Sequence, residues 1–268
     1  MPEVSVGWPV TGDELIRVQG VLAHEAAAVL KAAPWSLHGD PSIGGCFVAF
    51  ARGEAGPGQA GDRAWAAAVT WRPAASPFGR GGAPHRHPDD ALRGAVAEGG
   101  PRRSSDVDDQ AVVADRVPAG YAPGLLALRE GPILAAAVGA LDAVPDVVLV
   151  DATGLDHPRR AGLAVHLGAV TGLPTVGVTH GSLLAAGDLP SVVRGASSPA
   201  LLEGSTVGYW LCTRTGARPV LVHAGWRTDP ETALAVVLLA STEAARTPVP
   251  LQEARRVARE ARAVAGGG

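Results

Sequence analysis

Residues 145–160 read Pro-Asp-Val-Val-Leu-Val-Asp-Ala-Thr-Gly-Leu-Asp-His-Pro-Arg-Arg. The run at 146–150 is short and almost wholly apolar, which is typical of a strand buried on both faces of a parallel sheet. It leads directly to Asp151, which precedes a turn containing Gly154. Ligands of open α/β sheets bind at the carboxyl ends of the strands, so this position favours a functional carboxylate. The alternative is that Asp151 only caps the turn.

A second informative stretch lies upstream. Residues 121–130 read Tyr-Ala-Pro-Gly-Leu-Leu-Ala-Leu-Arg-Glu. We predict a helix over residues 131–141 with Pro132 in its first turn, where a missing backbone N–H costs nothing. Glu130 would then precede the helix and stabilise its N-terminus. A capping role and a metal-binding role for Glu130 both remain open.

The remaining elements follow from periodicity and capping residues. Thr11 is a predicted N-cap with Glu14 three residues later, and Asp229 is a second N-cap followed by Pro230. Further strands are predicted at residues 42–50, 64–71, 111–117, 175–178, 206–213 and 219–223, and further helices at 159–171, 229–239 and 251–264. Strands first, then alternating helices and strands, predict a mixed α/β sheet with helices on both faces.

Composition places limits on the function. The chain has 268 residues, of which 47% are hydrophobic, and a net charge of −3. This charge gives no overall attraction to nucleic acid, so a nucleic-acid enzyme of this composition needs a local basic surface. No signal peptide or membrane-spanning run is visible, and we expect a cytoplasmic monomer. We predict one domain over residues 1–265, with a flexible insertion at 72–110 and a disordered tail at 266–268.

Cysteines and the insertion carry weaker signals. Cys46 and Cys212 lie in apolar, strand-like runs, which favours buried thiols over a disulfide or a metal pair. The insertion is rich in Pro, Gly, Arg and Asp, which is typical of a surface loop. A metal site formed there by His85, His87 and Asp89 is the less favoured interpretation.

The blocks at residues 121–132 and 145–178 resemble those of the endonuclease V family, which cuts nucleic acid near deaminated purines, such as inosine, with a divalent metal. The resemblance covers residues 8–71 and 111–262. It implies a ribonuclease H-like fold, a mixed β-sheet flanked by helices on both faces. It also implies Mg²⁺ or Mn²⁺ as the cofactor and DNA or RNA, inosine-containing strands included, as the partner.

The same resemblance implies catalytic roles. Glu130 and Asp151 match metal carboxylates of the family. Arg129 and Glu130 together match its Arg-Glu pair near the metal. His180 stands where the family has a catalytic lysine. Arg129 and His180 are therefore expected to neutralise phosphate charge near the metal.

Substrate contacts are implied at other positions. Tyr121 and Pro123 match the wedge that separates the strands at the lesion. Gly124 and Leu126 match backbone positions that enclose a flipped hypoxanthine. His157 and Arg159 belong to the Gly-x-x-His-Pro-Arg run that follows the second carboxylate, and both are expected to contact the substrate.

Several family positions are replaced in this chain. Phe47 stands where the first metal-binding aspartate is expected, and a phenyl ring cannot coordinate a hard cation. Trp226 replaces a late histidine, and Gly120 replaces the proline before the wedge. The lost ligand should weaken Mg²⁺ binding, and loss of a positioned acid or base typically costs about 10²–10⁴-fold in rate.

Compensation within the chain is conceivable. His180 and His223 would supply nitrogen ligands, which favours Mn²⁺ or Zn²⁺ over Mg²⁺. Asp62 and Asp156 are spare carboxylates, and Asp156 lies in the second block, close to the expected site. A partly buried histidine at a strand end is the favoured interpretation of His223.

Three functions are therefore compatible with the sequence. The first is metal-dependent cleavage near inosine, weakened or altered by the replaced residues. The second is a catalytically silent relative that binds inosine-containing or distorted nucleic acid without cutting it. The third is a protein scaffold or regulator that no longer binds nucleic acid. The orientation of Phe47 separates them, since a ring that points into the metal site argues against the first.

Overall fold

The computed structural model describes residues 7–51, 58–73 and 107–266. Most of the predicted insertion, with His85, His87 and Asp89, lies outside the described residues, as do the last two residues of the predicted tail. Cys46 and Cys212 are both buried free thiols, as predicted.

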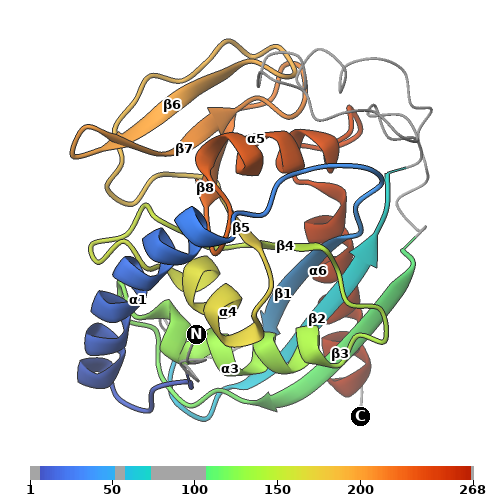
Figure 1. The fold of residues 1–268 in the computed structure, drawn as a ribbon. Coiled ribbons are helices and arrows are strands. Elements are labelled where there is room, and N and C mark those ends of the chain that lie inside the picture. Colours follow the sequence, from blue (N-terminus) through green and yellow to red (C-terminus); the bar gives the residue numbers. More distant parts are fainter. Residues whose placement is uncertain (1–6, 52–57, 74–106, 267–268) are drawn as a thin grey trace.

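The described chain forms an eight-stranded mixed sheet with the order β3-β2-β1-β4-β5-β8-β7-β6 (Figure 1). The strands are β1 (Ile43–Phe50), β2 (Arg63–Trp71), β3 (Asp109–Arg116), β4 (Val147–Val150), β5 (Thr175–Thr179), β6 (Ser197–Leu202), β7 (Ser205–Leu211) and β8 (Val220–Ala224). β4 is parallel to both of its neighbours, β1 and β5, and every other pairing is antiparallel. All four residues of β4 are buried, as its apolar sequence predicts.

Helices cover both faces of this sheet, which confirms the predicted architecture. They are α1 (Gly12–Ala32), α3 (Leu126–Gly139), α4 (Leu163–Thr171), α5 (Pro230–Leu239) and α6 (Val249–Gly266). Figure 1 shows α6 on the opposite side of β1 and β2 from α3. Among the described residues, no helix combines the length and the apolar character that crossing a membrane requires.

Side-chain alternation along β2 creates these two layers. Ala66 and Ala68 belong to the core cluster that contains α3, whereas Ala67 and Val69 pack with Val257 of α6. Successive side chains of a strand point to opposite faces, so one apolar strand can be buried on both sides.

Two helix boundaries differ from the prediction. α3 begins at Leu126, so Glu130 and Pro132 lie inside the helix and Glu130 does not precede it. The predicted proline boundary was wrong because burial of Ala127 and Leu128 against the sheet outweighs the local proline signal. Pro132 costs one helical hydrogen bond there.

The second boundary is that of α4, which begins at Leu163 and not at Arg159. Arg160 has a positive φ of 52°, a conformation that no α-helix accommodates. The sequence prediction also missed β6, because Pro199 argues against a strand interior. β6 lies at the end of the strand order, where an absent N–H is tolerated.

The two predicted N-caps are confirmed. The Thr11 side chain accepts a hydrogen bond from the backbone N–H of Glu14, and the Asp229 side chain accepts one from that of Thr232. Pro230 occupies the first helical position of α5. These local signals were readable because they depend on residues three positions apart.

The contact between α6 and β1 depends on Gly45. A Cβ atom at this position would overlap the carbonyl of Pro250, the second residue of α6. The glycine therefore allows the helix backbone to approach the strand directly.

We expect Gly45→Ala to lower the free energy of unfolding by about 1–3 kcal/mol or more, because α6 must shift away from β1. Gly20→Ala is the matched control, since an added Cβ on this exposed glycine of α1 meets nothing within 4 Å. It should stabilise the helix by up to about 1 kcal/mol. Denaturant unfolding of both variants tests this. A Gly45→Ala variant as stable as the unmodified protein would contradict the close approach of α6 to β1.

Candidate functional site

Phe47, which lies within β1, is a neighbour of Asp151, the residue that follows β4. The parallel register pairs Cys46 with Val150, so the next residues along the two chains, Phe47 within β1 and Asp151 after the end of β4, lie beside each other. The Phe47 ring faces α6, with the guanidinium carbon of Arg255 4.9 Å from the ring centroid and that of Arg259 6.0 Å away. The register therefore places a phenyl ring where the resemblance implies a metal-binding carboxylate.

Arg255 also pairs directly with Asp151. Its Nη2 donates to Oδ2 of Asp151 over 2.9 Å, and the two side chains are 26% and 30% exposed. Sequence reasoning missed Arg255, because it lies 104 residues from Asp151 in an arginine-rich helix that resembles an ordinary solvated face. No local motif marks it.

Glu130 lies close enough to Asp151 for the two charges to interact. Burial and, to a smaller extent, the charge of Asp151 raise the pKa of Glu130 to about 7, against the opposing effect of Arg129. Burial, Asp151 and Glu130 likewise raise the pKa of the Cys46 thiol. The structure thus brings together the two carboxylates that sequence reasoning had paired.

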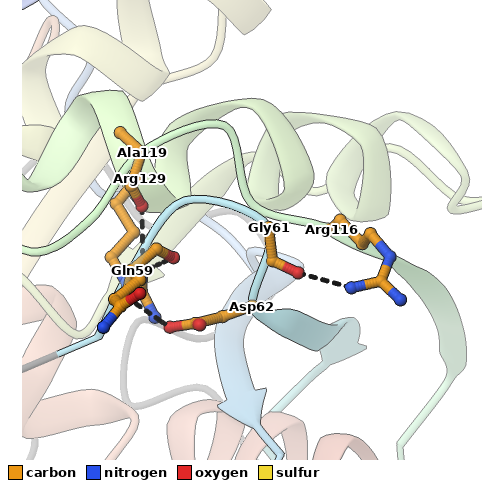
Figure 2. A network of polar contacts seen from close by, with 6 residues as sticks. All are labelled: Gln59, Gly61, Asp62, Arg116, Ala119 and Arg129. Atoms are coloured by element: carbon orange, nitrogen blue, oxygen red, sulfur yellow. Dashed lines mark hydrogen bonds and ion pairs between the residues drawn. The ribbon is translucent and has the colours of Figure 1, made fainter. Parts of the chain in front are cut away.

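Arg129 has a different environment from the one expected for a phosphate contact. Its side chain is buried, and Nη2 donates to Oδ2 of Asp62 over 2.6 Å (Figure 2). Nη1 donates to the carbonyls of Gln59, over 2.9 Å, and Ala119, over 2.8 Å. The guanidinium also lies over the Phe50 ring, 4.2 Å from its centroid. Arg129 therefore fastens the turn before β2 to the segment that leads to Tyr121.

The carbonyl oxygen of Gly124 is a second anchoring point. Arg159 Nη2 donates to it over 2.8 Å, His157 Nε2 lies 3.2 Å away, and Gln19 Nε2 lies 3.5 Å away. Gly124 has a φ of 73°, a conformation that favours glycine. His157 and Arg159 thus hold the backbone of the loop.

Tyr121 and Pro123 lie between these two anchors, and we call residues 119–125 the wedge loop. Both side chains are exposed, Tyr121 to 48%. Leu126, the other expected substrate residue, is partly buried and opens α3.

Three polar candidates remain: His180, which is exposed, and His223 and Asp156, which are buried. His180 follows β5 and is exposed; its partial burial, Arg246 and Arg255 lower its pKa, against the opposing effect of Asp151. His223 is fully buried, more than predicted, with its Nε2 2.8 Å from Oγ1 of Thr179. Burial lowers the pKa of His223 to about 4.

Asp156 and Trp226 stabilise the fold. The Asp156 carboxylate is buried and accepts hydrogen bonds from three consecutive backbone N–H groups, at residues 183–185. Trp226 packs in a hydrophobic cluster with Leu22 of α1 and Val165 of α4. The position of the family's late histidine is therefore a core position here.

The chain is similar to one known protein family. The family model described as Endonuclease V matches residues 95–256, more than half of the chain. This chain belongs to the endonuclease V family. Endonuclease V of Streptomyces coelicolor is 43% identical over 161 residues, which are 58% of this chain and 69% of that protein. Endonuclease V of Roseiflexus sp. is 40% identical over 154 residues, 58% and 68% of the two chains.

Solved structures extend the similarity to nearly the whole chain. Endonuclease V of Streptomyces avermitilis superposes with a TM-score of 0.71 at 29% identity and covers 97% of both chains. The catalytic domain of human endonuclease V has a TM-score of 0.64 at 26% identity and covers 91% of this chain and 96% of its own. These matches confirm the ribonuclease H-like fold. β1, with Phe47, lies outside the family-model match but inside the structural one.

The divalent metal that the family implies does not fit the described residues. Glu130 and Asp151 are the acidic donors at the site, and one oxygen of Asp151 is held by Arg255. Within the ranges that the structure describes, no group of three or more His, Cys, Asp or Glu residues could hold a metal ion. Hard cations such as Mg²⁺ and Mn²⁺ need several oxygen ligands, and this site offers too few.

His157 yields a prediction about stability. Its hydrogen bonds suit a neutral ring, in which Nε2–H donates to Gly124 and Nδ1 accepts the N–H of Arg159 over 3.2 Å. Burial lowers its pKa to about 4 from the ordinary value of 6.5, although the Gly124 hydrogen bond opposes this. Between these values the unfolded chain binds more protons, so stability should fall as the pH falls through this window.

We expect His157→Gln to flatten this part of the pH profile by on the order of 1–3 kcal/mol. His24→Gln, at an exposed histidine of α1, is the control and should leave the profile unchanged. Denaturant unfolding across the window measures both. If the profile keeps its slope in His157→Gln, the ring is not held neutral by the fold.

Proposed function

We propose that this endonuclease V family member recognises nucleic acid that contains a deaminated purine, with Tyr121 as the residue inserted at the lesion. The observation that carries the proposal is an exposed tyrosine on a loop fixed at both ends by arginine side chains. Arg129 holds the carbonyl of Ala119, and Arg159 holds that of Gly124.

Preorganisation explains why such anchors would matter. Inserting an aromatic ring into a base stack costs a few kcal/mol of unstacking, and a loop that also had to order itself would add to this cost. Since both carbonyls are held in the free protein, the loop that carries the Tyr121 ring is already ordered before nucleic acid binds. Gly124 and Leu126 follow Tyr121 closely and would form the rim against which the extruded base rests.

Two arginines near the end of β5 support a nucleic-acid partner despite the negative net charge. Arg246 and Arg255 both act on the pKa of His180, so these three groups share one region at the end of β5. The charges of the two guanidinium groups would provide the local attraction that the composition lacks. Among the structural relatives, endonuclease V of Ciona intestinalis was solved with a DNA 24-mer that contains inosine followed by a ribo-adenosine; at 17% identity and a TM-score of 0.62 it shares the fold.

Cleavage is the second candidate function. One observation favours it, namely that Glu130 and Asp151 lie together at the positions implied for the family's metal carboxylates. The incomplete donor set argues against it, and binding without cleavage therefore fits the described residues better.

One assay separates the two candidates. Labelled oligonucleotides would carry inosine in single-stranded DNA, duplex DNA or RNA, with adenosine-containing strands as controls, each in Mg²⁺, Mn²⁺ or EDTA. Inosine-selective binding without cutting is the expected result. Metal-dependent cutting beside inosine would establish the second candidate, and equal affinity for both sets of strands would contradict recognition of the deaminated purine.

We expect Tyr121→Ala to weaken binding to inosine-containing single-stranded DNA about tenfold or more, because aromatic stacking on a base contributes roughly 1–3 kcal/mol. Tyr121→Phe is the matched control, since it keeps the ring and should retain most of the affinity. Fluorescence anisotropy in EDTA measures both. Equal affinities of Tyr121→Ala and the unmodified protein would exclude Tyr121 as the inserted residue.

A further inference from the structure

The cation that neutralises Asp151 belongs to the protein itself. We propose that the Arg255 guanidinium takes the place of the divalent metal beside Asp151, so that the site is independent of metal ions. The inference concerns the site of the proposed function and extends it, because nucleic acid would then be bound by a built-in cation.

The positive charge of Arg255 lies directly against the Asp151 carboxylate. Arg255 Nη2 lies 2.9 Å from Oδ2 of Asp151, within the distance of a charge-assisted hydrogen bond. A divalent ion at this carboxylate would have to displace the guanidinium or lie beside it. Displacement loses the ion pair, and coexistence places like charges in contact.

The Phe47 ring stabilises the arginine in this position. It supports the guanidinium of Arg255 at 4.9 Å, a distance at which a cation is attracted to the face of an aromatic ring. An aspartate in place of Phe47 would be a metal ligand, whereas the phenylalanine stabilises the arginine that competes with the metal. The two residues therefore form one unit, and a change at either position alone leaves the site incomplete for a metal ion.

The packing of α6 fixes this unit in place. The helix lies directly on β1 at Gly45, and Ala254 and Val257 are buried against the sheet on either side of Arg255. Arg255 is still 26% exposed, so part of it faces solvent. It can therefore hold Asp151 and still present positive charge to a phosphate group.

Mn²⁺ binding tests the inference without any nucleic acid. Electron paramagnetic resonance of free Mn²⁺ would be followed in titrations of the unmodified protein and of the double variant Phe47→Asp/Arg255→Gln. We expect no saturable binding to the unmodified protein. The double variant, with three carboxylates and no competing guanidinium, should gain saturable binding of one Mn²⁺, at least about tenfold tighter than any residual binding by the unmodified protein.

Two further variants define the site. Arg256→Gln removes the neighbouring arginine of α6, which pairs with Glu253 and Glu260, and should behave like the unmodified protein. Adding Asp151→Asn to the double variant should abolish the gained binding. Circular dichroism and thermal unfolding establish that each variant is folded.

Two results would overturn the inference. One is saturable Mn²⁺ binding by the unmodified protein that Asp151→Asn removes, a measurement that does not depend on the double variant folding. The other is a folded double variant that gains no Mn²⁺ affinity. Oligonucleotide binding in EDTA tests the proposed function separately. If the unmodified protein binds Mn²⁺ through Asp151 and also recognises inosine, this inference is contradicted and the proposed function is not.

Discussion

The direct contact between α6 and β1 is the constraint on which the site depends. With no side chain at Gly45, the second residue of the helix lies against the strand backbone. This close approach sets the height of α6 above the sheet and brings Arg255 to both Phe47 and Asp151. A residue with a side chain at Gly45 would separate the helix from the strand, and the ion pair would lengthen with it.

Two arginines, Arg129, which is buried, and Arg159, which is partly buried, form the second organising feature. Arg129 and Arg159 both bind backbone carbonyls of the wedge loop, and each is also held by a polar side chain, Asp62 or Gln19. A planar guanidinium with several fixed donors can join three chain segments at once, which a lysine cannot do. These residues position the loop that carries Tyr121, and the exposed tyrosine is left to contact a ligand.

The comparisons divide the chain into two parts. The family model matches residues 95–256, which include Glu130, Asp151 and the wedge loop. The fold extends through both parts, since the Streptomyces avermitilis structure covers 97% of the chain. The replaced position, Phe47, lies in the part that the family model does not match. Fold is set by burial patterns that many sequences satisfy, whereas a metal site requires particular ligands, so one can persist without the other.

The sequence by itself determined the local and periodic features. The apolar run before Asp151 predicted a buried parallel strand, and Thr11 and Asp229 marked helix starts, because each signal depends on residues only a few positions apart. It also placed Phe47 beside the candidate site. Only the tertiary structure decided that Glu130 lies inside α3 and that Asp156 binds three backbone N–H groups. Only the tertiary structure likewise pairs Asp151 with Arg255, since contacts across 104 residues follow from how helices pack on the sheet and leave no local pattern.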